Sequence, residues 1–118
     1  MKERRKAQRV EAKLAISISG GRGEAMGQTL NISTNGVYFK SSRFIEPLTK
    51  VQLELIIPDP ADPKKEGTPV MCDGLIVRVD PEQEDPSVSI YHAAIFFTYI
   101  SESAQKTLDN YIRRRLTV

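Results

Sequence analysis

Apolar and polar side chains alternate along two stretches of this chain, and that pattern most narrowly limits what it can fold into. A period of two places every second side chain on the same face of a strand, so each stretch predicts a strand with one buried face. The apolar positions are Val10, Ala12, Leu14, Ile16 and Ile18 in the first stretch, and Val51, Leu53, Leu55 and Ile57 in the second.

Turn-forming residues separate these stretches from further runs that favour strands. Gly20-Gly21-Arg22-Gly23 predicts a turn, because glycine adopts positive φ at low cost. The proline-rich segment 58–67 predicts a loop, since proline cannot donate to a sheet ladder. Gly74 predicts a bulge or a close contact within its strand. The remaining expected strands cover residues 24–32, 37–40, 70–79 and 88–99.

The last segment changes to a helical period. Ser101 is a suitable N-cap, and cations at the end of the segment favour the helix dipole. The apolar positions are Ala104, Leu108, Tyr111, Ile112 and Leu116, and Arg113, Arg114 and Arg115 lie in the expected last turn.

These elements predict an all-β domain with a terminal helix: a small six-stranded antiparallel barrel plus a C-terminal α-helix. The expected organisation is a single domain over residues 1–118. It comprises a flexible basic arm (1–9), a β-barrel (10–99) and a helix (101–116). Side chains already fill barrels of about eight strands, so any ligand is expected on the outside.

Charge is concentrated at the start of the chain. Residues 1–9 carry +4 and the remainder carries −2, giving +2 in total. A basic arm on a mildly acidic body favours local capture of an anion. The chain lacks the ~20 consecutive apolar residues of a membrane helix, and its start lacks the apolar core of a signal peptide. Together with the lone Cys72, this predicts a cytoplasmic protein without membrane insertion.

Two short polar motifs are the candidates for function. Arg5 and Arg9 lie four residues apart, and guanidinium groups bind phosphates and the acceptor edge of guanine in bidentate fashion. The segment 31–36 reads Asn-Ile-Ser-Thr-Asn-Gly, whose short side chains let a ligand approach the backbone. Each motif also has a plain interpretation. Terminal cations improve solubility, while Asn and Ser cap their own backbone and Gly36 supplies an unusual dihedral.

An enzyme is not supported by the residue types present. His92 is the only histidine and lies within an expected strand, and its distance in sequence from Cys72 leaves no zinc-ligand spacing. The acidic positions of the proline-rich loop lack EF-hand spacing. We therefore expect no catalytic residue, no metal and no cofactor.

The two motifs, taken together with the strand pattern, resemble the PilZ domain family. The resemblance extends over nearly the whole chain. It includes an Arg-three-spacers-Arg arm, an Asp/Asn-x-Ser-x-x-Gly turn, a Gly-containing fifth strand at residues 73–78 and a closing segment at residues 94–97. The motif positions are Arg4, Arg5, Arg9, Asn31, Ser33 and Gly36. One departure is Ala94, where the family often has glycine.

The resemblance implies a barrel that binds the bacterial messenger cyclic di-GMP and signals to a protein effector. In that interpretation the six motif residues form the ligand site, and Val37 packs beneath a base. Two alternatives stay open. One is a PilZ-like interaction module that binds no ligand. The other, less favoured, is a nucleic-acid binder that uses the arm and the arginines at 113–115.

Overall fold

The structure is a computed structural model that describes residues 8–21, 23–59, 61–62 and 66–116. Arg4, Arg5 and most of the basic arm therefore lie outside the described residues. The strands are β1 (Val10–Glu11), β2 (Ala15–Gly20), β3 (Gly23–Ile32), β4 (Gly36–Ser41), β5 (Lys50–Ile57), β6 (Thr68–Asp80) and β7 (Tyr91–Ile100), and the helix is α1 (Glu102–Leu116).

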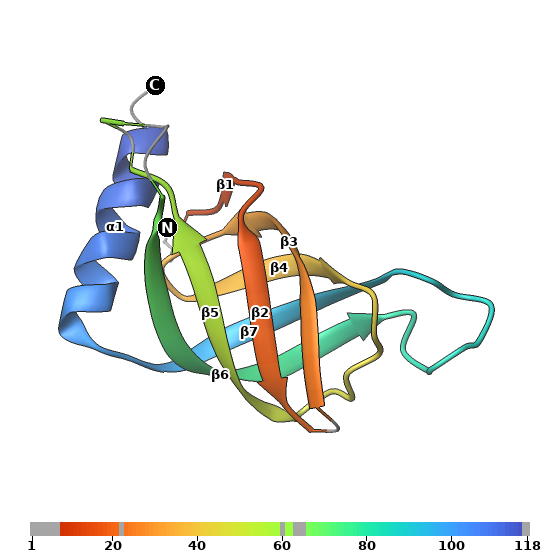
Figure 1. Cartoon of the computed structure of the whole chain (residues 1–118). Coiled ribbons are helices and arrows are strands. Elements are labelled where there is room, and N and C mark those ends of the chain that lie inside the picture. The colour runs from red at the N-terminus through yellow and green to blue at the C-terminus, as the bar shows by residue number, and fades with distance from the viewer. Residues whose placement is uncertain (1–7, 22, 60, 63–65, 117–118) are drawn as a thin grey trace, which may run out of the picture.

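The strands form a closed antiparallel barrel. Their order is β1-β3-β2-β5-β6-β7-β4, and an additional pairing of β3 with β4 closes the sheet. Figure 1 shows the barrel with α1 beside it and the long loop between β6 and β7 extending away from it. The predicted fold class, a six-stranded barrel with a C-terminal helix, is confirmed.

The first predicted strand is divided into β1 and β2, although its side chains alternate in burial as expected. Glu11 pairs with Asn31 and Ala15 pairs with Gln28. The three residues between β1 and β2 therefore lie opposite only two residues of β3. The buried Thr29 hydroxyl fills the gap, because it accepts the Leu14 N–H at 2.8 Å and donates to the carbonyl of residue 12. This side-chain bridge fixes β1 at the rim of the barrel.

The last predicted strand begins three residues later than expected, at Tyr91. Asp85 organises the preceding segment as a turn, because its carboxylate accepts the backbone N–H of Ser87 at 2.9 Å and its carbonyl accepts the Val88 N–H at 2.9 Å. The predicted irregularity at Gly74 is confirmed by a register shift between Asp73 and Gly74. A Cβ at position 74 would lie 2.5 Å from Ile95 Cγ2.

Apolar side chains fill the interior of the barrel. The largest fully buried ones include Phe39, Ile16, Ile32, Leu53, Leu55, Ile76 and Ile95. Burial on this scale stabilises the fold by roughly 1.5–3 kcal/mol per large side chain before entropy is counted. A ligand of nucleotide size must therefore bind on the outer surface.

The helix α1 closes the core from one side, packing against β6, β5 and β1. It begins as predicted, since Ser101 Oγ accepts the Ala104 N–H at 3.2 Å. Its buried face contains Leu108, Tyr111 and Ile112. Within the part of the chain that the structure describes, no helix is long and apolar enough to cross a membrane.

Candidate functional site

The two polar motifs meet at the rim of the barrel. Arg9 is exposed and immediately precedes β1, and the pairing of Glu11 with Asn31 places that strand beside the end of β3. Arg9 Nη1 donates a hydrogen bond to Asn31 Oδ1 at 2.8 Å. The remaining guanidinium donors of Arg9 can still bind an anion, because the side chain lies at the surface.

The turn between β3 and β4 is held by its own backbone and by β7. The Ser33 N–H donates to the Gly36 carbonyl at 2.9 Å, and the Phe97 N–H donates to the Asn35 carbonyl at 2.8 Å. Ser33 is only 2% exposed, and its hydroxyl accepts the Asn35 N–H at 3.1 Å. In this structure the Ser33 side chain therefore shapes the turn.

Gly36 is needed because of a close contact. Its φ is not among the positive values of the described glycines, so the unusual dihedral considered from the sequence is wrong. A Cβ at position 36 would lie 2.2 Å from the Ile95 carbonyl oxygen. Only glycine lets β4 pair with β7 at this point without moving backbone.

A row of side chains crosses four strands beside the turn. Asn31 pairs with Tyr38, Tyr38 with Ala94, and Ala94 with Arg78. The Arg78 guanidinium lies 5.9 Å from the centre of the Tyr38 ring. An aromatic ring and a second guanidinium thus lie on the outer face next to Asn31, where they can stack on a base or bind a phosphate.

Sequence reasoning missed this outer row and chose Val37 instead. Val37 is 0% exposed, so its expected contact with a base is wrong. Tyr38 is the residue that faces outward, as the alternation along β4 requires. Arg78 could have been found only with the sheet register, because the shift between Ile76 and Arg78 moves it onto the row with Tyr38. Ala94, the departure noted above, lies in the same row.

His92 and Cys72, the other ionisable residues considered from the sequence, each have a structural explanation. His92 stacks on Tyr38 with ring centroids 6.0 Å apart. Burial, with a smaller contribution from the charge of nearby Asp73, raises the pKa of the Cys72 thiol to about 12, so the thiol stays neutral. Among the described residues, no group of three His, Cys, Asp or Glu could hold a metal ion.

The fold and the site together define a class of protein. It is a small β-barrel domain with a polar site on its outer surface, where Arg9 contacts Asn31. A family model for the PilZ domain matches residues 3–114. The chain therefore belongs to the PilZ domain family.

Three solved structures share the fold at low sequence identity. The Bacillus subtilis inhibitor of motility MotI/DgrA has a TM-score of 0.75 and 19% sequence identity. The match covers 98% of this chain and 52% of that one, so this chain spans about half the length of MotI/DgrA. The PilZ domain of Escherichia coli YcgR, solved with c-di-GMP, has a TM-score of 0.70 and 11% identity, covering 98% of this chain and 93% of that one.

The PilZ domain of CeSA from a cellulose-synthesizing bacterium has a TM-score of 0.57 and 15% identity, covering 93% of this chain and 96% of that one. No curated protein matches this chain. At these identities the solved structures show the fold alone.

Proposed function

We propose that this chain is a non-catalytic receptor for cyclic di-GMP, acting in the cytoplasm as an adaptor to a protein effector. The observation that carries the proposal is the contact of Arg9 with Asn31, which joins two motifs that are separated in sequence. The family membership and the c-di-GMP named for the YcgR domain support the choice of ligand.

The chemistry of the site suits this ligand. Cyclic di-GMP offers two phosphates and two guanines, and each guanine presents the O6 and N7 acceptors. Arg9 and Asn31 would bind phosphate oxygens or base edges directly. Ser33 and Gly36 would hold the turn in position. Tyr38 and Arg78 would extend the site across the outer face, where a guanidinium 5.9 Å from an aromatic ring offers a stacking surface.

Arg4 and Arg5 complete the proposed site, although they lie outside the described residues. In this account the ligand draws the basic arm at residues 1–9 across the barrel rim. The arm has few apolar residues, so a bound anion would supply interactions that the arm cannot make with a core. A repositioned arm changes the surface available to an effector.

Competition separates this proposal from its two alternatives. Fluorescent cyclic di-GMP bound to the purified chain should be displaced by unlabelled cyclic di-GMP and not by single-stranded oligonucleotides of similar charge. Displacement by oligonucleotides at equal phosphate concentration would support the nucleic-acid binder. Absence of binding by the folded chain would support the module without ligand.

A further inference from the structure

The outer face of β3, β2, β5 and β6 has an unusual composition. One row across these four strands is Met26, Ser17, Glu54 and Met71, and the neighbouring row is Glu24, Ser19, Gln52 and Asp73. Met26 is 72% exposed and Met71 is 61% exposed. The two rows contain three carboxylates and neither lysine nor arginine, although the whole chain carries a net +2.

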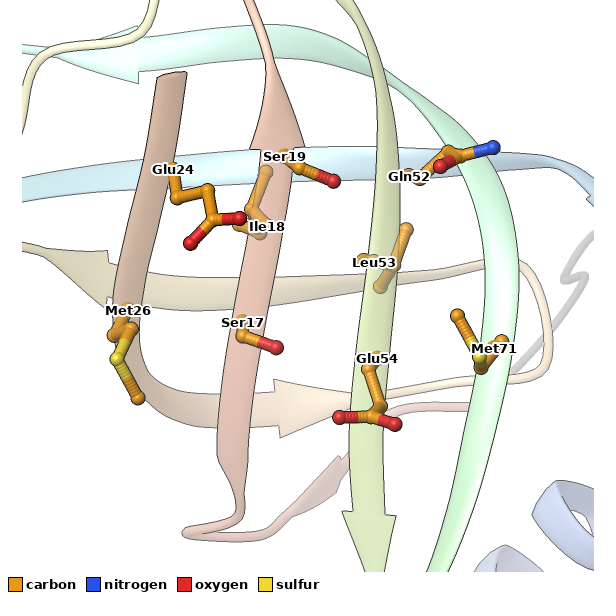
Figure 2. Close-up of a pocket in the computed structure, with 9 residues that line it drawn as sticks. All are labelled: Ser17, Ile18, Ser19, Glu24, Met26, Gln52, Leu53, Glu54 and Met71. Atoms are coloured by element: carbon orange, nitrogen blue, oxygen red, sulfur yellow. The ribbon is translucent and has the colours of Figure 1, made fainter.

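The two methionines border a shallow hollow. Figure 2 shows Met26 and Met71 on opposite sides, with Ser17 and Glu54 between them. The hollow has a volume of about 330 Å³. That is the lower end of the range for small-molecule sites, which are usually enclosed and mostly apolar. This hollow is open rather than enclosed, so it is better suited to side chains of a macromolecular partner.

The spacing and charge of the face indicate the kind of partner. Neighbouring strands lie about 4.8 Å apart, so three spacings separate the methionine backbones by about 14 Å. A helix about 10 Å in diameter fits between them. Methionine side chains adapt to many apolar surfaces, while Glu24, Glu54 and Asp73 complement basic side chains.

We propose that this surface, defined by Met26, Met71, Glu24, Glu54 and Asp73, is the docking site for a basic amphipathic helix of a protein partner. Lysine or arginine side chains of that helix contact the carboxylates, and its apolar side chains lie between the two methionines. The surface includes the start of β3, whereas Asn31 lies near its other end, so a nucleotide at the rim leaves the surface open. The proposal does not require that the chain bind cyclic di-GMP.

The test uses two labelled peptides of about 18 residues, long enough to be partly helical: one of lysine and leucine, the other with glutamate in place of lysine. Fluorescence anisotropy should show that the full chain binds the lysine peptide and not the glutamate peptide. Glu54→Lys should weaken binding about tenfold or more, because it turns an attraction into a repulsion. The double variant Met26→Ser/Met71→Ser should also weaken it.

Glu82→Lys is the matched control, because it makes the same change of charge in the exposed loop after β6. It should bind the lysine peptide as the parent does. Circular dichroism checks that each variant is folded, and the two exposed methionines can be replaced without disturbing the core.

Three results would overturn the proposal. The first is failure of the parent to bind the lysine peptide. The second is an equal loss of binding in Glu54→Lys and Glu82→Lys. The third is self-association of the parent, measured by sedimentation, that Glu54→Lys abolishes. In that case the occupant is a second copy of this chain, whose α1 ends in exposed arginines.

Discussion

Arg9 Nη1 donates to Asn31 Oδ1 at 2.8 Å, so one hydrogen bond joins residues that are 22 positions apart in the chain. The pairing of β1 with β3 is what brings them together. An exposed hydrogen bond of this kind contributes only ~1 kcal/mol to stability, because water competes for both groups. A ligand can therefore take over either partner at little cost to the fold.

Ser33→Ala should lower the free energy of unfolding by about 1–3 kcal/mol, because the Asn35 N–H then loses its acceptor in a partly buried turn. Urea unfolding measures this change. Ser42→Ala, at an exposed position just after β4, is the control and should be near neutral. Unchanged stability combined with lost ligand binding would show instead that the Ser33 hydroxyl contacts the ligand directly.

Gly36→Ala should destabilise the fold by at least ~1–3 kcal/mol, because the added Cβ would lie 2.2 Å from the Ile95 carbonyl and must displace backbone. Thermal unfolding without ligand tests this. A variant that melts at the parent's temperature would contradict the close approach of β4 and β7 described here.

The C-terminal helix should be coupled to the candidate site through Arg115. Its guanidinium donates to the Glu11 carbonyl and lies 5.9 Å from the centre of the Tyr111 ring. Arg115→Ala should speed hydrogen exchange in β1 about fivefold, which corresponds to ~1 kcal/mol.

Arg113→Ala is the matched control, because the hydrogen bond from Arg113 to Asn110 stays within the helix. Exchange measured by mass spectrometry over β1 should be unchanged in it. Equal effects of the two variants would mean that Arg115 has no special contact with β1.

Stability should fall as pH rises above about 9 because of Cys72. Its pKa is raised from 9.0 to about 12 in the folded chain, so the unfolded chain releases this proton first and is favoured between those values. Urea unfolding at about pH 8 and about pH 10 should show a larger loss for the parent than for Cys72→Ala, which lacks the thiol. Equal losses would contradict a buried, neutral thiol.

Local patterns were enough to predict most of the fold. The alternation along β2 and β5 and the helical period with its Ser101 cap are local, and each describes one face of one element. The break between β1 and β2 was not predictable in the same way. It depends on Thr29 of β3, whose hydroxyl accepts the Leu14 N–H and donates to the Ala12 carbonyl.

The site was predictable only where residues are close in sequence or belong to a family motif. Arg9 and Asn31 came from such motifs, and the structure brings them together. Tyr38 and Arg78 share a face only because the register of β4, β7 and β6 aligns them. The inward orientation of Ser33 likewise depends on a turn held by β7, which no local pattern contains.

Calorimetry with cyclic di-GMP on the parent chain and on Arg9→Ala tests the central claim most directly. The parent should show saturable binding with a defined stoichiometry. Arg9→Ala should bind about two to four powers of ten more weakly, since at least two charge-assisted hydrogen bonds of roughly 1.5–3 kcal/mol are lost. Because Arg9 is exposed, the variant should remain folded. No heat of binding from the folded parent, or equal affinity in Arg9→Ala, would contradict the account.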